Sequence, residues 1–207
     1  MTRYLRAVFD RVIAMGCDYV QLDAPNYAMF HTDPEIRAYF ESRGHDLDKE
    51  IAADAEYDSA VFAGLREQGV TCALHVCRGN PGGGGDRWMG KGGYEYIAPA
   101  IFPRLTNVDT LLLEYDSSRA GDFPPLRHVR DDTVAVLGLM TTKAAALETV
   151  EELESRIRQA AEVVPLERLA VSPQCGFASV EAGNPVTVEE QEAKLSRLVA
   201  VARKVWR

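Results

Sequence analysis

Four side chains with the chemistry of metal ligands stand at the ends of short apolar runs in this 207-residue sequence. His75 and Cys77 close the run TCALHVC (71–77), Glu114 lies within TLLLEYD (110–116), and Cys175 ends LAVSPQC (169–175). Two thiolates, one imidazole and one carboxylate form a suitable tetrahedral donor set for Zn²⁺, whereas Mg²⁺ prefers oxygen ligands. The spacing alone leaves a second interpretation open, in which the cysteines are small buried core residues.

The charge of such a donor set indicates which reaction it would serve. Two thiolates and one carboxylate around Zn²⁺ leave a formal net charge of about −1. An ion this rich in electrons activates water poorly, but it can hold an incoming thiol as a nucleophilic thiolate. The pattern therefore favours alkyl transfer to sulfur over hydrolysis.

Short apolar runs alternate with helical patterns along the whole chain. Strands are predicted over 19–24, 71–77, 110–116, 134–139 and 169–175. Helices are predicted over the first 16 residues, twice within 34–68, and over 94–105, 144–163 and 187–206. This alternation predicts an α/β fold with a parallel sheet. In a parallel α/β barrel the active site lies at the C-terminal ends of the strands, where the candidate ligands stand.

Strand parity places the candidate residues on one face of the sheet. Side chains alternate along a strand, so His75 and Cys77 share one face and Cys72 points to the other. Gln21 and Asp23 likewise point to the same side of the run 19–24. We interpret Cys72, and also Cys17, as structural core residues.

Composition and charge exclude several classes of partner. A net charge of −8 argues against nucleic acid or an anionic membrane as the main partner. The sequence contains no apolar run long enough to span a bilayer, and its first 16 residues form an amphipathic pattern that differs from a signal peptide. The four cysteines do not show the spacing of a disulfide framework. We expect one soluble, cytoplasmic domain over residues 1–207.

The glycine-rich segment 79–93 follows the second predicted strand. It lacks the spacing of a phosphate-binding P-loop. We interpret it as a loop over the site, with Arg78, Asn80 and Trp88 as candidate substrate contacts.

Four segments together resemble a known family: YVQLDAPNY, LHVCRGN, LLLEYDSSRAGDF and LAVSPQCGFAS, in that order. They are similar to the C-terminal catalytic barrel of cobalamin-independent methionine synthase, and most similar to its short single-domain branch, which includes enzymes resembling epoxyalkane:coenzyme M transferase. The resemblance implies a TIM-type (β/α)8 barrel of the methionine synthase/uroporphyrinogen decarboxylase type. It also implies a zinc ion held by His75, Cys77, Glu114 and Cys175. Asp23, with Gln21 beside it, matches the aspartate that holds the polar end of the thiol substrate.

The implied activity is methyl transfer from 5-methyltetrahydropteroyl(tri)glutamate to the zinc-bound thiolate of homocysteine, which gives methionine. Two departures from the family pattern bear on this substrate pair. Ala24 replaces a glutamate of the family, and the segment LGLMTTK (137–143) lacks the histidine that the family carries there. Two alternatives therefore stay open: alkyl transfer to another thiol, for example coenzyme M adding to an epoxide, or a noncatalytic zinc-binding fragment.

The family barrel has eight strands, and this sequence matches about the last five strand–helix units. A half-open barrel would expose strand edges, which readily pair with other chains. We therefore expect either that the chain is truncated relative to the barrel or that a second copy or a partner chain completes it.

Overall fold

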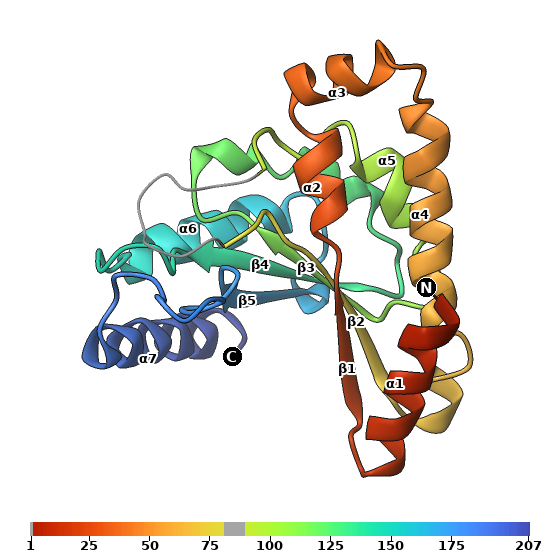
Figure 1. Cartoon of the computed structure of the whole chain (residues 1–207). Coiled ribbons are helices and arrows are strands. Elements are labelled where there is room, and N and C mark those ends of the chain that lie inside the picture. Colours follow the sequence, from red (N-terminus) through yellow and green to blue (C-terminus); the bar gives the residue numbers. More distant parts are fainter. Residues whose placement is uncertain (1, 81–89) are drawn as a thin grey trace.

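Five strands form a single parallel sheet in the computed structural model, which describes residues 2–80 and 90–207. The strands lie in chain order, β1-β2-β3-β4-β5, and each pairs in parallel with the next. Their bounds are β1 Tyr19–Asp23, β2 Thr71–Val76, β3 Thr110–Glu114, β4 Val134–Met140 and β5 Leu169–Pro173. The strands turn from nearly vertical in β1 to nearly horizontal in β4 and β5 (Figure 1). Sequential parallel order with this twist is the geometry of a partial barrel wall, as the sequence predicts.

Helices connect the strands. The α-helices are α1 Thr2–Ala14, α2 Pro25–His31, α3 Pro34–Glu41, α4 Leu47–Val61, α5 Ala98–Ile101, α6 Val150–Ala161 and α7 Val188–Val205. Short 3₁₀ turns cover Arg66–Gln68, Phe102–Arg104, Ser118–Ala120, Pro124–His128 and Leu166–Arg168. Figure 1 shows α1 and α4 beside the β1–β2 end of the sheet and α6 and α7 beside β4 and β5. No helix in the described part of the chain is both long and apolar enough to cross a membrane.

The core lies between the sheet and these helices. Alternate strand residues face it, namely Val20, Cys72, Leu74, Val76, Leu111, Leu113, Ala135 and Leu137. The buried position of Cys72 confirms its assignment as a core residue, and burial raises the pKa of its thiol to about 11. Cys17 is half-buried, and its Sγ lies 3.0 Å from the carbonyl oxygen of Tyr19.

The opposite face of the sheet is more open. Gln21 is exposed, and Leu112 and Ser172 are only half-buried, although a closed barrel would bury such positions. His75 lies on this face, as strand parity predicts, and Gln21 Nε2 donates to Asp23 Oδ1 over 3.1 Å. The functional residues therefore project from the face that a complete barrel would enclose.

Several helix boundaries differ from the sequence-based expectations. The helix predicted over 144–163 begins only at Val150, because Thr149 and Glu152 form a capping box there. The helix predicted over 94–105 is reduced to α5 and the 3₁₀ turn that follows it. The prediction also missed α2, whereas the capping box of Thr187 and Glu190 at the start of α7 is confirmed.

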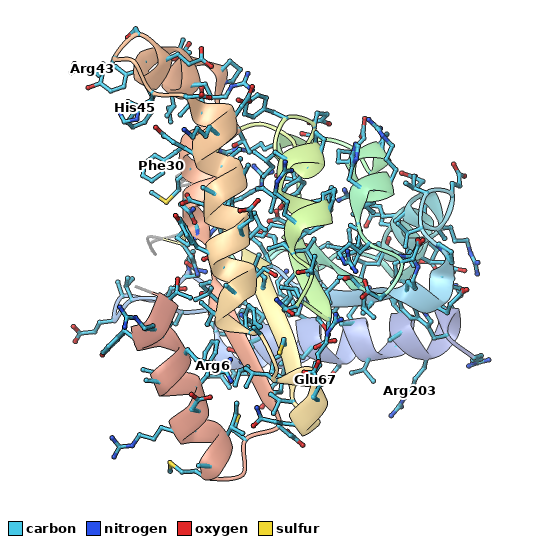
Figure 2. All side chains as sticks on the ribbon, turned by 90° about the vertical axis from the view of Figure 1, so that its right-hand side faces the viewer. Arg6, Phe30, Arg43, His45, Glu67 and Arg203 are labelled. Carbon is cyan, nitrogen blue, oxygen red and sulfur yellow. The ribbon has the colours of Figure 1, made fainter. Side chains whose placement is uncertain are left out.

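The helices near the N-terminus pack on one another beside the sheet. Phe9 of α1 stacks on Phe62, which caps the C-terminus of α4, with 5.5 Å between ring centroids. Arg6 reaches from α1 to the carbonyl oxygen of Ala63, and Figure 2 shows Arg6 between the two helices. Phe30 and His45 project to the same side of α4 in that view. The contacts of Phe9 and Arg6 join α1, which precedes β1, to the C-terminal end of α4, which precedes β2.

Candidate metal centre

The structure brings the four candidate ligands together at the C-terminal edge of the sheet. His75 is on β2, Cys77 follows β2 directly, Glu114 ends β3, and Cys175 lies two residues beyond β5. One ligand atom from each lies within 4.8 Å of all the others. His75, Cys77 and Glu114 are buried, and Cys175 is half-buried. The ligands come from three strands, and Cys77 and Cys175, which are 98 positions apart, share one small volume with the other two.

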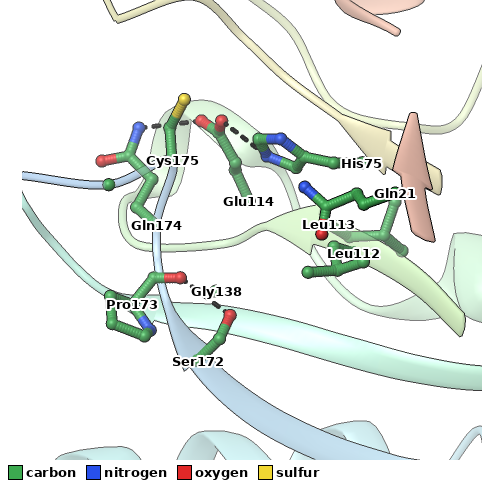
Figure 3. A pocket seen from close by; sticks show the side chains of 11 residues that line it. Gln21, His75, Leu112, Leu113, Glu114, Gly138, Ser172, Pro173, Gln174 and Cys175 are labelled. Carbon is green, nitrogen blue, oxygen red and sulfur yellow. Dashed lines mark hydrogen bonds and ion pairs between the residues drawn. The ribbon is translucent and has the colours of Figure 1, made fainter. Parts of the chain in front are cut away.

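The distances within the group suit a single cation. The Sγ atoms of Cys77 and Cys175 are 3.2 Å apart, and His75 Nε2 lies 3.4 Å from Glu114 Oε1. Figure 3 shows His75 and Glu114 facing each other, with Cys175 beside them. Sulfur, nitrogen and oxygen donors in this number match the preference of Zn²⁺ for a tetrahedral site.

Glycines shape both segments that carry the cysteines. Gly79 has φ +84° and Gly176 has φ +111°, backbone conformations that residues with a Cβ rarely adopt. The turn at Gly79 also points its N–H at Cys77 Sγ, 3.3 Å away. Each chain segment thus turns sharply just after its cysteine and leaves the sulfur at the strand edge.

A carboxylate orients the imidazole. Asp23 Oδ1 lies 3.1 Å from His75 Nδ1, which leaves Nε2 directed toward Glu114 and the two sulfurs. A histidine ligand commonly bonds a carboxylate through its other ring nitrogen, which sets its tautomer and orientation. The Asp23 side chain is 60% exposed, and its Oδ1 also accepts the bond from Gln21.

Two neighbours hold the Glu114 carboxylate, which is 1% exposed. Its Oε1 accepts the backbone N–H of Arg78 at 3.1 Å, and its Oε2 accepts Gln174 Nε2 at 2.8 Å. The hydroxyl of Tyr94 contacts the backbone N and O of Glu114, so the end of β3 is fixed as well. Sequence reasoning missed Gln174, although it directly precedes Cys175.

The close approach of the ligands shifts the pKa values of His75, Cys77 and Cys175. Burial acts to lower the pKa of His75, but hydrogen bonds to Asp23 and Glu114 and the charge of Cys77 together raise it to about 10. The hydrogen bond from Cys175 lowers the pKa of Cys77. The same contact, together with burial, raises the pKa of Cys175. Cys175 therefore holds its proton more tightly than Cys77 does, and His75 is protonated near neutral pH.

The predicted substrate contacts occupy different environments. Gln21 lines a cavity of about 200 Å³ that His75, Glu114 and Cys175 also border. Arg78 is 1% exposed, and its guanidinium donates to the carbonyl oxygen of Gly92 and lies 4.6 Å from the ring centroid of Tyr94. Asn80 is buried among hydrogen-bond partners. Trp88 lies outside the described residues.

The sequence matches a known family and known proteins. Residues 98–204 match the family model "Cobalamin-independent synthase, Catalytic domain". The uncharacterized protein YxjH of Bacillus subtilis (strain 168) is 41% identical over 200 residues, which cover 93% of this chain and 50% of that protein. The 2-hydroxypropyl-CoM lyase of Xanthobacter autotrophicus is 27% identical over 189 residues, which cover 80% of this chain and 45% of the lyase.

The fold has a counterpart among solved structures. A B12-independent methionine synthase from Shewanella sp. W3-18-1, solved in complex with selenomethionine, superposes with a TM-score of 0.70 at 21% identity. The superposition covers 99% of this chain and 53% of the synthase, which shows the shared fold. This chain spans about half the length of the relatives that it matches.

Proposed function

The chain belongs to the cobalamin-independent synthase catalytic-domain family, and from this membership we propose that it transfers a methyl or other alkyl group to the sulfur of a small-molecule thiol. The observation that carries the proposal is the meeting of two cysteines, one histidine and one glutamate at the C-terminal edge of the sheet. The specific reaction we propose is methyl transfer from 5-methyltetrahydropteroyl(tri)glutamate to homocysteine, with methionine as the product.

Zn²⁺ is the proposed cofactor because its preferred donors match those present. The two sulfurs, 3.2 Å apart, disfavour Mg²⁺ and Ca²⁺, which take oxygen ligands. Bound by His75, Cys77, Glu114 and Cys175, Zn²⁺ would hold the substrate thiol as a thiolate at neutral pH.

The surrounding residues position the ligands and the thiol substrate. Asp23 keeps His75 in the orientation that directs Nε2 toward the ligand cluster. Gln174 and the Arg78 N–H hold both oxygens of Glu114 in place. We propose that the exposed part of the Asp23 carboxylate, with Gln21 beside it, binds the polar end of the thiol. The cavity of about 200 Å³ that Gln21 and His75 line suits a small substrate of this kind.

The atoms of the proposed reaction balance without an oxidant or a reductant. The thiol gives up its proton, and its sulfur forms a bond to the alkyl carbon. The bond from that carbon to the donor breaks, and its electron pair stays with the donor, which takes up a proton. Redox chemistry is therefore not required of the protein.

A second thiol remains a candidate substrate. The sequence similarity to a 2-hydroxypropyl-CoM lyase favours coenzyme M and an epoxide-derived alkyl group as the alternative pair. Two sequence features also favour this alternative pair, because both depart from the methionine synthase pattern. Ala24 follows Asp23, and the segment 137–143 contains no histidine. A noncatalytic zinc-binding role is the third candidate.

A panel of thiols tests these candidates. Zinc-loaded protein is incubated with homocysteine or coenzyme M and with either methyltetrahydropteroylglutamate or an epoxide, and the thioether product is measured by mass spectrometry. X-ray absorption at the zinc edge, with and without each thiol, shows whether a substrate sulfur binds the metal. The proposal predicts product with one pair and none with Cys77→Ser. A metal site that binds zinc but admits no added sulfur, with no product from any pair, would support the noncatalytic role.

A further inference from the structure

Cys77 and Cys175 approach each other although their strands are not neighbours. Cys77 follows β2 and Cys175 follows β5, with β3 and β4 between them in the sheet. Backbone hydrogen bonds of the described sheet join β2 only to β1 and β3, and β5 only to β4. The 3.2 Å separation of the two sulfurs therefore depends on contacts made beyond the strand ends.

Asn80 makes such a contact between the two cysteine segments. Its Nδ2 donates to the carbonyl oxygen of Gly176 at 3.0 Å and to the hydroxyl of Ser179 at 2.9 Å. Asn80 lies three residues after Cys77, and Gly176 directly follows Cys175. The side chain thus ties the backbone beside one sulfur to the backbone beside the other.

Lys143 sets the orientation of the Asn80 amide. Its ammonium donates to Asn80 Oδ1 at 2.8 Å and lies 3.5 Å from the carbonyl oxygen of Gly79. Because an ammonium group can only donate, it must face the amide oxygen, and the Asn80 NH₂ group then faces Gly176. Lys143 lies just beyond β4, so the network joins segments that follow three different strands. Both side chains are at least nine-tenths buried, with 4% of Lys143 and 8% of Asn80 exposed.

The Lys143 charge also suits this place. Two cysteine sulfurs and one carboxylate lie within 4.8 Å of one another and of the His75 ring, and a buried ammonium nearby offsets part of the negative charge that they carry when they bind a metal ion. An uncharged side chain of the same length would lose both this charge and the bond to Asn80.

We propose that Asn80 and Lys143 are positioning residues that hold the Cys77 and Cys175 segments at the separation needed for both sulfurs to bind one metal ion. The inference rests on the proposed metal site and goes beyond it, because neither residue is a ligand.

Zinc affinity and cobalt spectra of matched variants test the proposal. The test variants are Asn80→Ala and Lys143→Met. The controls are Asn107→Ala, whose amide contacts Ser59 instead, and Lys194→Met, whose buried ammonium pairs with Glu148. Zinc dissociation constants come from competition with a chromophoric chelator, and the Co²⁺-substituted proteins show thiolate-to-metal charge-transfer bands that report the number of bound sulfurs.

The test variants are expected to bind zinc about 10- to 100-fold more weakly, with a reduced charge-transfer band per cobalt, whereas the controls keep the wild-type values. Ser179→Ala, which removes one of the three Asn80 bonds, is expected to have a smaller effect of the same sign. If Asn80→Ala fails to fold, Asn80→Asp is measured in its place. It keeps the size and the Lys143 contact but places a carboxylate oxygen against the carbonyl of Gly176, so it is expected to weaken binding as well.

A second readout requires neither a metal nor an alkyl donor. In zinc-free wild-type protein, diamide is expected to oxidise the adjacent thiols rapidly to a Cys77–Cys175 disulfide, detected by peptide mass spectrometry. Asn80→Ala and Lys143→Met are expected to slow this cross-link, and the two controls are not. Wild-type rates of cross-linking together with wild-type zinc affinity in both test variants would overturn the inference. Absence of alkyl transfer by a protein that passes both tests would instead count against the proposed function alone.

Discussion

Asp23 and His75 face each other across the β1–β2 ladder as register partners, with Asp23 Oδ1 3.1 Å from His75 Nδ1. A slip of one residue in this register would turn the imidazole to the face that packs on the helices. Sheet register therefore sets both the position of the histidine and the carboxylate that orients it. The remaining nitrogen, Nε2, is left 3.4 Å from Glu114.

Zinc binding should release protons from the site. The folded-state pKa of His75 is raised from 6.5 to about 10, and burial with the contact to Cys77 raises the pKa of Cys175 as well. Because a ligand must be deprotonated, zinc displaces the protons on His75 and Cys175, and about two protons or more should be released per ion at pH 7.5. Calorimetry in buffers of different ionisation enthalpy measures this number. Zinc affinity should accordingly rise with pH, and an affinity independent of pH between 7 and 9 would contradict the assigned protonation.

The same shift has a consequence for the stability of the zinc-free protein. Since the pKa of His75 is higher in the folded state, its protonated form stabilises the fold. That contribution is complete below about pH 6.5 and is lost as the pH rises through about 10. Chemical denaturation across this range, compared with His75→Gln, should show a pH-dependent difference that disappears at the alkaline end.

Replacing Asp23 by asparagine should separate the two roles of its carboxylate. Asp23→Asn removes the negative charge that raises the pKa of His75, so fewer protons should be released on zinc binding at pH 7.5. At high pH, where His75 is neutral in both proteins, the variant should bind zinc about 10-fold more weakly because its imidazole is less firmly oriented. The NMR titration of His75 and chelator competition measure the two effects. Asp54→Asn, whose carboxylate contacts Asn26 instead, is the matched control.

Gln174→Leu should destabilise the site through Glu114. The variant leaves Glu114 Oε2 without the donor that lies 2.8 Å away, in a carboxylate that is 1% exposed. A hydrogen bond to a buried charged group contributes about 2 kcal/mol, so the free energy of unfolding should fall by about that amount. Urea denaturation measures the change, with Gln159→Leu on the surface of α6 as a control. Equal stability of both variants would show that Gln174 does not hold Glu114 in solution.

Substitution of Cys77 should affect zinc binding, whereas substitution of Cys72 should affect only the stability of the fold. Cys77→Ser should abolish stoichiometric zinc binding, since it removes one of the two sulfur donors. Cys72→Ala should retain full zinc content and lose about 1 kcal/mol of folding free energy, because Cys72 packs in the core on the opposite face of β2. Metal analysis and thermal unfolding of both variants test this pair. Loss of zinc from folded Cys72→Ala protein would show that Cys72 does not point away from the metal site.

Much of the site could be predicted because the strands that carry it depend on short stretches of the sequence. The short apolar runs predict buried parallel strands, and their order along the chain places His75, Cys77, Glu114 and Cys175 at strand ends. Alternation of side chains along a strand then assigns faces without knowledge of the rest of the fold. The start of α6 was not predictable in the same way, because several polar residues before Val150 could each begin the helix and only Thr149 forms a capping box.

The sequence by itself thus determined the strands, their order and the identity of the candidate ligands. Only the tertiary structure decided which polar residues support them. The partners of Asn80, Gly176 and Ser179, are 96 and 99 positions away, and Gln174 reaches Glu114 over 60 positions. Such pairings depend on how loops turn beyond the strand ends and on which groups burial forces to find a partner. The periodicity of the sequence contains no information on these loop turns or on these polar pairs. They form only after the sheet has brought the strand ends together.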